Sequence, residues 1–363
     1  ELPALQRWDA ADPAPGGATV WGRGTASTSR AALLNGTAGH ALDFDDAVPA
    51  SPLHPSTVLW PAVLAVAEVR GSTWTDALAA VDVGNAVVRA VTEALPGDAH
   101  YGRGWHTTST VGRIAAVCAL ARLLHLDATT TRHALGIVAS TAAGSRASFG
   151  TATKPLHAGL AAHDAVVAVA MAEAGVDAHP AQLDSPLGFL ALYGEPADRT
   201  AFAARLAHRA AAWPQDWSLK RYPSCYGTHY ALDAVLALAP SVSGVVQRVD
   251  VRVHPGSLRP LIARRPTTGA EGRFSLEYTV ASALADGRLG LDAFTDLALH
   301  RETVVALMDR VHVRGEGEPA DLPEVVGLPY AHVRVVTAGA THERLVTVTH
   351  GDARDPLSAA EVD

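Results

Sequence analysis

The first half of the chain has the apolar periodicity of helices. Apolar residues recur every three to four positions or occupy every face, and Gly, Pro or a capping residue stands between successive segments. Ser72, Thr73 and Asp127 have side chains that favour helix N-termini. This pattern predicts helices over 29–45, 55–70, 74–95, 109–125, 128–142 and 156–175.

The second half of the chain mixes this pattern with alternation of Val and polar residues. The alternation predicts strands over 245–254, 332–338 and 343–349, with helical stretches over 228–238, 275–286 and 301–310. Gly339 indicates a hairpin between the last two strands. We therefore expect a mainly α protein with a large helical domain over 1–215, a smaller α+β lid domain over 216–350, and a tail over 351–363 towards a further helical segment.

Composition and charge narrow the function classes. The 363 residues are 48% hydrophobic and 18% charged, which is typical of a folded chain with a sizeable core. A net charge of −8 and the lack of a basic run argue against a nucleic-acid partner. The cysteines Cys118 and Cys225 are too few for a disulfide framework. Because no uninterrupted apolar run is long enough to span a membrane and no signal-peptide pattern occurs, we expect a cytoplasmic protein with no membrane partner.

The basic residues are almost all arginine. Of the 29 Lys and Arg residues, the only lysines are Lys154 and Lys220. A coding bias that replaces Lys by Arg accounts for this scarcity, and two lysines can survive it by chance. A surviving lysine is nevertheless a candidate for chemistry that Arg cannot perform, because a buried Lys can lose a proton and Arg stays charged.

Four polar segments interrupt the apolar pattern. They are 43–46 with the following His54, 102–110, 146–157 and 220–229. The first places three carboxylates at a predicted helix end, where they oppose the helix dipole and indicate local hydrogen bonding, a site, or a solvated helix end. This string also matches the D-x-D-D motif of class II terpene cyclases, but no other feature of the sequence supports that match. The second is an anion-binding helix start or an ordinary N-cap beside a surface His. The last two each contain one lysine, the first of them in a Gly/Thr loop and the second beside Arg221, where a surface lysine is the alternative.

Several well-known motifs are missing from the sequence. There is no H-E-x-x-H, no short paired His spacing of a zinc site, no G-x-S-x-G, no P-loop and no G-x-G-x-x-G after a strand. We therefore expect a site without metal or organic cofactor that uses His, Lys, Tyr and Asp side chains.

Five ordered motifs give the chain a family resemblance. They are N-G-T-A-G-H-A-L-D-F-D-D with H-P-S, G-W-H-T-T-S-T, S-F-G-T-A-T-K-P-L-H-A-G, K-R-Y-P-S-C-Y-G-T-H and F-S-L-E-Y. With these motifs the chain resembles the MmgE/PrpD family, which includes 2-methylcitrate dehydratase, cis-aconitate decarboxylase and iminodisuccinate epimerase. The resemblance implies a helical domain with an α+β lid, a homodimer, an active site between the two domains, and no cofactor.

The resemblance also implies which residues act. The positions that match the family's active-site residues are Asp43, His54, His106, Lys154, Lys220 and Tyr278. We expect His106 or His54 to transfer a proton at carbon, Lys154 and Lys220 to bind carboxylates, Tyr278 to deliver a proton, and Asp43 to orient a histidine or lysine. Further substrate contacts are expected from Thr107, Arg146 and Cys225.

The chain departs from the family pattern in places. Ala47 stands where the family often has Thr, and Tyr226-Gly227 stand where many members have Arg. The loop between Asp43 and His54 is about one residue longer than the decarboxylase-like pattern. The Arg that Tyr226-Gly227 replace is a candidate carboxylate clamp, and its loss weakens the case for a tricarboxylate substrate.

Three functions remain open at this level. The first is a lyase, a dehydratase or decarboxylase, acting on a small di- or tricarboxylate. The second is an epimerase or isomerase of a small dicarboxylate. The third is a non-catalytic helical binding protein that has kept the fold. All family reactions develop charge at a carbon beside a carboxylate, so cationic groups and a near-neutral proton carrier suit any of the enzymes.

Overall fold

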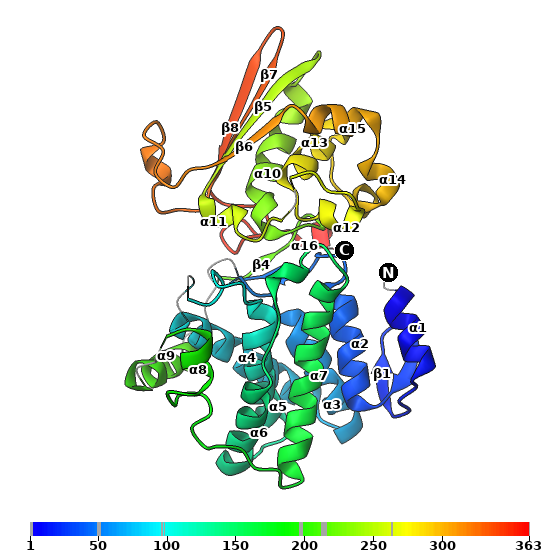
Figure 1. Ribbon diagram of the computed structural model, residues 1–363, viewed down its shortest axis with the longest axis vertical. Helices are drawn as coiled ribbons and strands as arrows, with labels where there is room; N and C mark the ends of the chain where they lie inside the picture. Colours follow the sequence, from blue (N-terminus) through cyan, green and yellow to red (C-terminus); the bar gives the residue numbers. More distant parts are fainter. Residues whose placement is uncertain are drawn as a thin grey trace. The chain divides into compact units, whose positions relative to one another are not determined.

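The computed structural model describes residues 3–48, 52–95, 97, 99–195, 199–211, 216–262 and 264–362. The chain forms two units (Figure 1). The first comprises Glu1–Ala41, Asp45–Ala147 and Ala152–Trp217, and the second comprises Leu42–Phe44, Ser148–Thr151 and Ser218–Asp363. Helices predominate and strands are a small share, so the expectation of a mainly α fold with an α+β part is confirmed.

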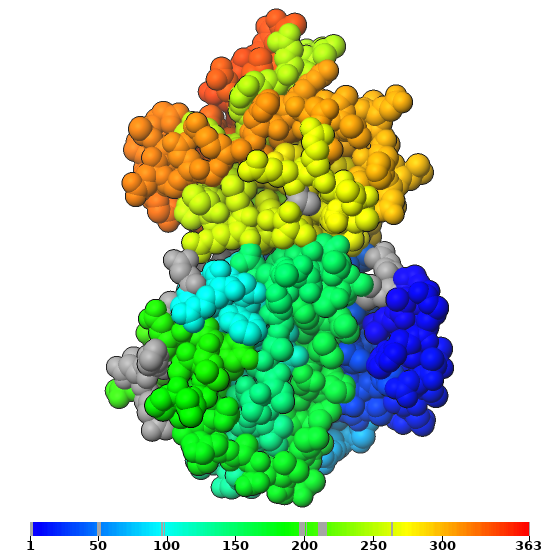
Figure 2. Space-filling model, in the orientation of Figure 1, coloured from blue at the N-terminus to red at the C-terminus, as the bar shows by residue number. Residues whose placement is uncertain are grey.

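Six helices with buried residues form the bulk of the first unit within the described residues. They are α2 (Thr28–His40), α3 (Ser56–Arg70), α4 (Trp74–Ala94), α5 (Thr107–Leu123), α6 (Ala128–Ser140) and α7 (Thr153–Glu173). At the side of this unit, α1 (Pro3–Ala11) and the hairpin of β1 (Ala18–Val20) and β2 (Gly24–Ala26) form the deep blue bulge of Figure 2. The remaining elements are β3 (Asp46–Ala47), η1 (Arg146–Ser148), α8 (Phe189–Tyr193) and α9 (Arg199–Ala211).

The central helix of the first unit is α5. It packs against α3, α4, α6 and α7, and nearly every residue along it is buried. A helix with apolar or small residues on all faces can pack in this way because it needs no solvent-facing side. His106 at the N-terminus of α5 and His157 near the N-terminus of α7 are likewise buried.

Helix α7 passes the length and composition test for a membrane span. Its most apolar 18-residue window has a mean hydropathy of 1.3, and 61% of that window is buried inside the protein. The helix packs against α2, α5 and α6. His157, His163 and Asp164 interrupt its apolar run. This burial is typical of a core helix.

The contact between α2 and α7 depends on glycine, which makes Gly159 a test of the packing. A Cβ atom at Gly159 would overlap the Oγ1 atom of Thr37 and the carbonyl oxygen of Leu33. We expect Gly159→Ala to lower the free energy of unfolding by roughly 1–3 kcal/mol, as overpacking does. Gly39→Ala on α2 is the control, because its new Cβ would lie 3.7 Å from the nearest atom. The control should keep or raise stability, since Ala favours helices, and urea unfolding of both variants measures the difference.

The second unit is built on a four-stranded sheet of order β6-β5-β7-β8. Strands β5 (Val246–Val253) and β6 (Val311–Gly315) are parallel, and β7 (Ala331–Thr337) and β8 (Thr341–Val346) continue antiparallel. Inward Val residues at alternate positions form the core with α10 (His229–Leu238) and α13 (Leu276–Asp286). The excursion between β6 and β7 forms the orange lobe of Figure 2.

The remaining elements of the second unit are short. They are β4 (Ser218–Leu219), η2 (Tyr226–Thr228), η3 (Ala239–Ser241), α11 (Pro255–Leu258), α12 (Gly269–Gly272), η4 (Leu291–Phe294), α14 (Asp296–Leu299), α15 (Glu302–Met308), η5 (Pro323–Val325) and α16 (Ala359–Val362). Of these, α15 packs against α13.

Most long elements predicted from the sequence are confirmed, with shifted ends. The helix predicted over 29–45 ends at His40, so the carboxylates of 43–46 follow the helix in a turn and do not lie at its C-terminus. Helix α7 begins at Thr153, so Lys154 belongs to a helical turn and not to a loop. The strand predicted over 343–349 occupies Thr341–Val346. Thr73 and Asp127 cap α4 and α6 as predicted.

Candidate active site

The segment after α2 brings two histidines of the first unit to one carboxylate. His40 ends α2, and its Nδ1 atom lies 2.5 Å from Oδ2 of Asp45. The Nδ1 atom of His54 lies 3.5 Å from Oδ1 of Asp45 and 2.7 Å from the carbonyl oxygen of Asp46. The two ring centroids are 4.7 Å apart. Asp45 therefore lies where it can orient both imidazoles, whose Nδ1 atoms serve as donors.

His40, Asp45 and His54 also have the spacing of a metal site, because one ligand atom from each lies within 4.8 Å of the other two. The hydrogen bonds point to another use of these residues. Both Nδ1 atoms face oxygen acceptors, so each carries the ring proton and has no lone pair for a metal ion. At these atoms the geometry favours a hydrogen-bond network over coordination.

His106 and His157 form an imidazole pair inside the first unit. His106 is the N-cap of α5, and His157 lies in the second turn of α7. Their Nδ1 atoms are 3.1 Å apart, a hydrogen-bond distance, so one Nδ1 donates and the other accepts. The His106 ring also stacks on His40, with centroids 6.1 Å apart. We call the four rings of His40, His54, His106 and His157 the histidine cluster.

Burial and positive neighbours keep the His106 and His157 rings neutral. Burial, followed by the charge of Lys154, lowers the pKa of His106 well below its usual value of 6.5. Burial, followed by the charge of Arg113, lowers the pKa of His157 to about 4. Lys154 is itself buried, in the first turn of α7. At neutral pH, positive charge beside the pair thus comes from Lys154 and Arg113, and the imidazoles can accept protons.

Thr107 offers a buried hydroxyl at the start of α5. Its Oγ1 atom has no hydrogen-bond partner among the described residues. Thr107 lines a cavity of about 80 Å³ with His100 and Tyr101, a space for two or three water-sized groups. His100 is fixed there, with its Nε2 atom 2.9 Å from the Oγ1 atom of Thr110. A substrate oxygen that entered this cavity would find the Thr107 hydroxyl available.

Lys220 and Asp43 form a buried ion pair in the second unit. The Lys220 ammonium donates to Oδ1 of Asp43, and the two side chains are 0% and 4% exposed. Asp43 has a left-handed backbone with φ of 53°, a conformation that Asp and Asn tolerate better than other non-glycine residues. Asp43 is expected to orient either a histidine or a lysine. This contact provides the lysine. The catalytic roles of both residues stay predictions.

His229 packs close to this ion pair. The pH dependence of stability tests whether its imidazole is buried and neutral. It is fully buried, and burial followed by the Lys220 charge lowers its pKa to about 3. The unfolded chain, with a His pKa near 6.5, therefore binds more protons than the folded chain between these values. We expect the His229 contribution to be constant above pH 6.5 and stability to fall as pH drops from 6.5 to 3, by up to about 1.4 kcal/mol per unit.

The matched variant for this pH dependence is His229→Gln, which cannot titrate in this range. Its free energy of unfolding in urea, measured at intervals between pH 7 and pH 4, should fall less steeply than that of the wild type. Equal slopes for the two proteins would contradict a buried neutral imidazole at this position.

Three other predicted site residues are held by protein groups. The Tyr278 hydroxyl donates to the carbonyl of Ala293, and Tyr278 is fully buried in the core of the second unit. The Arg146 guanidinium donates to the carbonyl of Tyr101 at 2.6 Å and lies over that residue's ring. Cys225 is buried with two phenylalanines in a small apolar cluster. The contacts of these residues with a substrate stay predictions.

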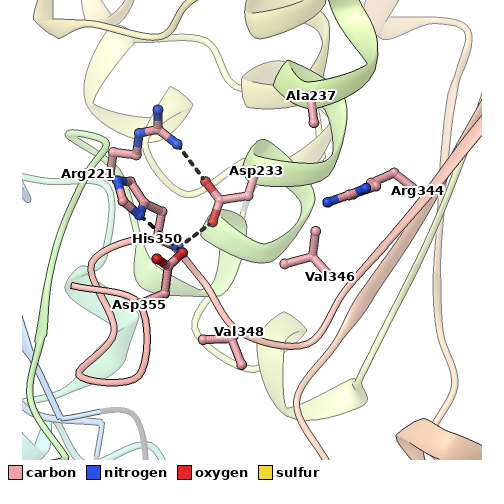
Figure 3. Close-up of a pocket in the computed structure, with 8 residues that line it drawn as sticks. All are labelled: Arg221, Asp233, Ala237, Arg344, Val346, Val348, His350 and Asp355. Carbon is pink, nitrogen blue, oxygen red and sulfur yellow. Dashed lines mark hydrogen bonds and ion pairs between the residues drawn. The ribbon is translucent and has the colours of Figure 1, made fainter. Parts of the chain in front are cut away.

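The second unit also has an open cavity of about 320 Å³ that contains none of the predicted site residues. Figure 3 shows Arg221 and His350 meeting at the carboxylate of Asp233, with Arg344 across the cavity. The Asp233 carboxylate accepts from the backbone N–H of His350 at 2.8 Å. The charge of Arg221 is thus compensated by Asp233.

Three members of the site are absent from the residues predicted by sequence: His40, Asp45 and His157. Signals for them existed, because all three lie inside the matched motifs, at G-H-A-L-D-F-D and T-K-P-L-H. His157 could not be singled out because its partner is far away in sequence, whereas His40 and Asp45 are near in sequence and meet only because of the turn after α2. His157 lies 51 residues from His106, and helix packing alone brings the pair together.

Comparison with known proteins places the chain in a family. The MmgE/PrpD N-terminal domain matches residues 3–201, and the MmgE/PrpD C-terminal domain matches residues 222–363. The chain belongs to the MmgE/PrpD family.

Relatives with assigned names are similar along most of the chain. The chain is 28% identical to the cis-aconitate decarboxylase of Homo sapiens over 366 residues, which covers 95% of this chain and 73% of the relative. The enzyme of the same name from Mus musculus is 28% identical over 368 residues, covering 95% and 72%. A cis-aconitate decarboxylase of Aspergillus terreus is 26% identical over 289 residues, covering 73% and 59%.

Proposed function

We propose that this protein is a cofactor-independent lyase that acts beside a carboxylate of a small di- or tricarboxylic acid, by dehydration or decarboxylation. The observation that carries the proposal is the buried, neutral His106 beside the buried ammonium of Lys154. The similarity to cis-aconitate decarboxylases supports an enzyme of decarboxylase-like or dehydratase-like activity.

The first part of the proposed mechanism is electrostatic stabilisation by Lys154. Lys154 binds a substrate carboxylate and stabilises the anion that develops at the neighbouring carbon. A bound carboxylate also offsets the positive charge that lowers the pKa of His106. The substrate thus raises the proton affinity of His106 at the moment when His106 must exchange a proton with carbon. A low pKa in the free protein keeps His106 neutral until the substrate arrives.

The other residues have supporting roles in this proposal. Asp45 orients His40 and His54, and His54 is the alternative proton carrier. Thr107 binds a substrate oxygen with its buried hydroxyl. Lys220 remains a proposed carboxylate ligand, although its ammonium already contacts Asp43. Tyr278 would have to release the Ala293 carbonyl to deliver a proton.

A substrate screen tests the proposal directly. The purified protein is incubated with 2-methylcitrate, citrate, cis-aconitate and iminodisuccinate, and the masses of the products are measured by mass spectrometry. Loss of water indicates a dehydratase, and loss of carbon dioxide a decarboxylase. Activity should survive EDTA, because the lyase is proposed to work without metal. An unchanged mass with a change of chirality indicates an epimerase, and four acids that change in neither mass nor chirality would favour the non-catalytic binding protein.

An epimerase is the second candidate, and the histidine cluster favours it. Epimerisation needs a proton carrier on each face of the carbon, and His54 and His106 are two imidazoles that both approach His40. Proton NMR in heavy water separates the candidates. Exchange at the α-carbon without loss of water or carbon dioxide would establish the epimerase.

Assembly and location complete the proposal. We propose a homodimer in the cytoplasm that acts on a small carboxylate and has no nucleic-acid or membrane partner. Light scattering during size-exclusion chromatography measures the assembly, and a monomer mass would contradict the homodimer.

A further inference from the structure

We propose that His157 relays protons between His106 and water, so that the two imidazoles act as one unit. In this arrangement His157 is a positioning residue that also sets which nitrogen of His106 carries the proton. The inference rests on the proposed function, in which His106 exchanges a proton with the reacting carbon.

The geometry of the pair couples the two tautomers. The Nδ1 atoms are 3.1 Å apart, and each neutral ring has a single N–H. When the His157 Nδ1 atom donates, the His106 proton sits on Nε2, and His106 is an acid toward the substrate. When the His106 Nδ1 atom donates, its Nε2 atom has the lone pair, and His106 is a base. The position of one shared proton therefore selects the function of His106.

Each ring of the relay loses one proton and gains one, in both directions of transfer. To protonate a carbanion, the His106 Nε2–H bond breaks and a C–H bond forms. The His157 Nδ1 proton moves to the His106 Nδ1 atom, and the His157 Nε2 atom takes a proton from water. Both rings end neutral with exchanged tautomers. Proton abstraction from carbon runs the same chain in reverse and restores the first state.

The surroundings suit His157 to this role. Burial, followed by the charge of Arg113 and more weakly that of Lys154, lowers the pKa of His157 to about 4, so the ring passes a proton on and does not retain it. Arg113 is itself anchored, with its Nε atom 2.8 Å from Oδ2 of Asp164. His157 is 7% exposed and His106 is 2% exposed, which makes His157 the member nearer to water.

The other two rings of the histidine cluster differ from this pair. The Nδ1 atoms of His40 and His54 face a carboxylate and a carbonyl, which only accept hydrogen bonds. Their tautomers are therefore fixed, and neither ring can exchange its Nδ1 proton with its partner. Among these Nδ1 contacts, the one between His106 and His157 joins two imidazoles and can reverse its direction of donation.

The first experiment examines the hydrogen bond without substrate. In protein labelled with ¹⁵N-histidine, NMR should detect a scalar coupling between the Nδ1 nuclei of His106 and His157 across the shared proton. The coupling should vanish in His157→Ala and persist in His179→Ala, which changes an exposed histidine of the same unit. Absence of the coupling in the wild type would overturn the proposal, whatever the substrate proves to be.

The second experiment separates positioning from relay. His157→Asn places an amide N–H near the former Nδ1 atom, so it can still donate to His106 but cannot pass a proton. We expect kcat to fall at least about tenfold with KM nearly unchanged, and His106 to keep its Nε2–H tautomer by NMR. His157→Ala should regain activity when imidazole is added, and His157→Asn should not, because its side chain fills the space.

The outcomes distinguish this inference from the proposed function. Wild-type kcat in His157→Asn would reject the relay and leave the lyase intact. If no acid in the screen is converted while the ¹⁵N coupling is present, the lyase fails and the shared proton stands as a property of the fold.

Discussion

His106→Ala is expected to lower kcat/KM by at least about a hundredfold, the usual size of a general acid–base contribution. The reason is that His106 combines burial, a strongly lowered pKa and contact with a second imidazole. Steady-state kinetics on the acid identified by the screen measures the effect. His179→Ala is the control, because this histidine is exposed and lies outside the histidine cluster.

Lys154→Ala should also lower kcat/KM by at least about a hundredfold, because it removes the positive charge that binds the substrate carboxylate. Lys154→Met provides the shape-matched comparison, because it keeps the length of the side chain and removes the ammonium group. Loss of the positive charge should also raise the pKa of His106 in the free protein, since Lys154 is the second-largest cause of its lowering. An NMR titration of His106 detects that rise independently of turnover. Near-wild-type kcat/KM in His106→Ala or Lys154→Ala would remove that residue from the proposed mechanism.

The sequence predicts the fold well where periodicity and caps act locally. Helices α4 and α6 have the N-caps Thr73 and Asp127, whose side chains accept from backbone N–H groups of the first turn. The end of α2 was missed because Asp43 adopts a left-handed φ, which apolar spacing does not reveal. The start of α7 was missed because Thr153 and Lys154 carry no apolar signal, although they belong to the helix.

The candidate site was predictable only in part. Rarity of lysine and the motifs point to Lys154 and His106 because each stands in a recognisable segment. The partner of His106 depends on α5 packing against α7, a tertiary contact that no local pattern encodes. Asp45 was hidden for another reason. Three aspartates share the D-F-D-D motif, and only the turn decides that Asp45 faces His40 while Asp43 faces Lys220.

Asp43→Asn is expected to lower the free energy of unfolding by about 3–5 kcal/mol, the cost of removing one partner from a buried ion pair. The pair is enclosed, with side chains 0% and 4% exposed. Asn keeps the shape of Asp and tolerates the left-handed backbone of residue 43, so the loss reports the missing charge. Urea unfolding of the variant and the wild type gives the difference.

Two comparisons make this result specific to the buried pair. Adding Lys220→Met to Asp43→Asn removes the uncompensated ammonium, so the double variant should recover part of the lost stability. Arg288→Met breaks an ion pair with Asp292 on the surface of the same unit, where the side chains are 65% and 66% exposed. That variant should lose less than about 0.5 kcal/mol. If Asp43→Asn costs no more than Arg288→Met, the Lys220 ammonium does not depend on Asp43, and its charge is available to bind a substrate carboxylate.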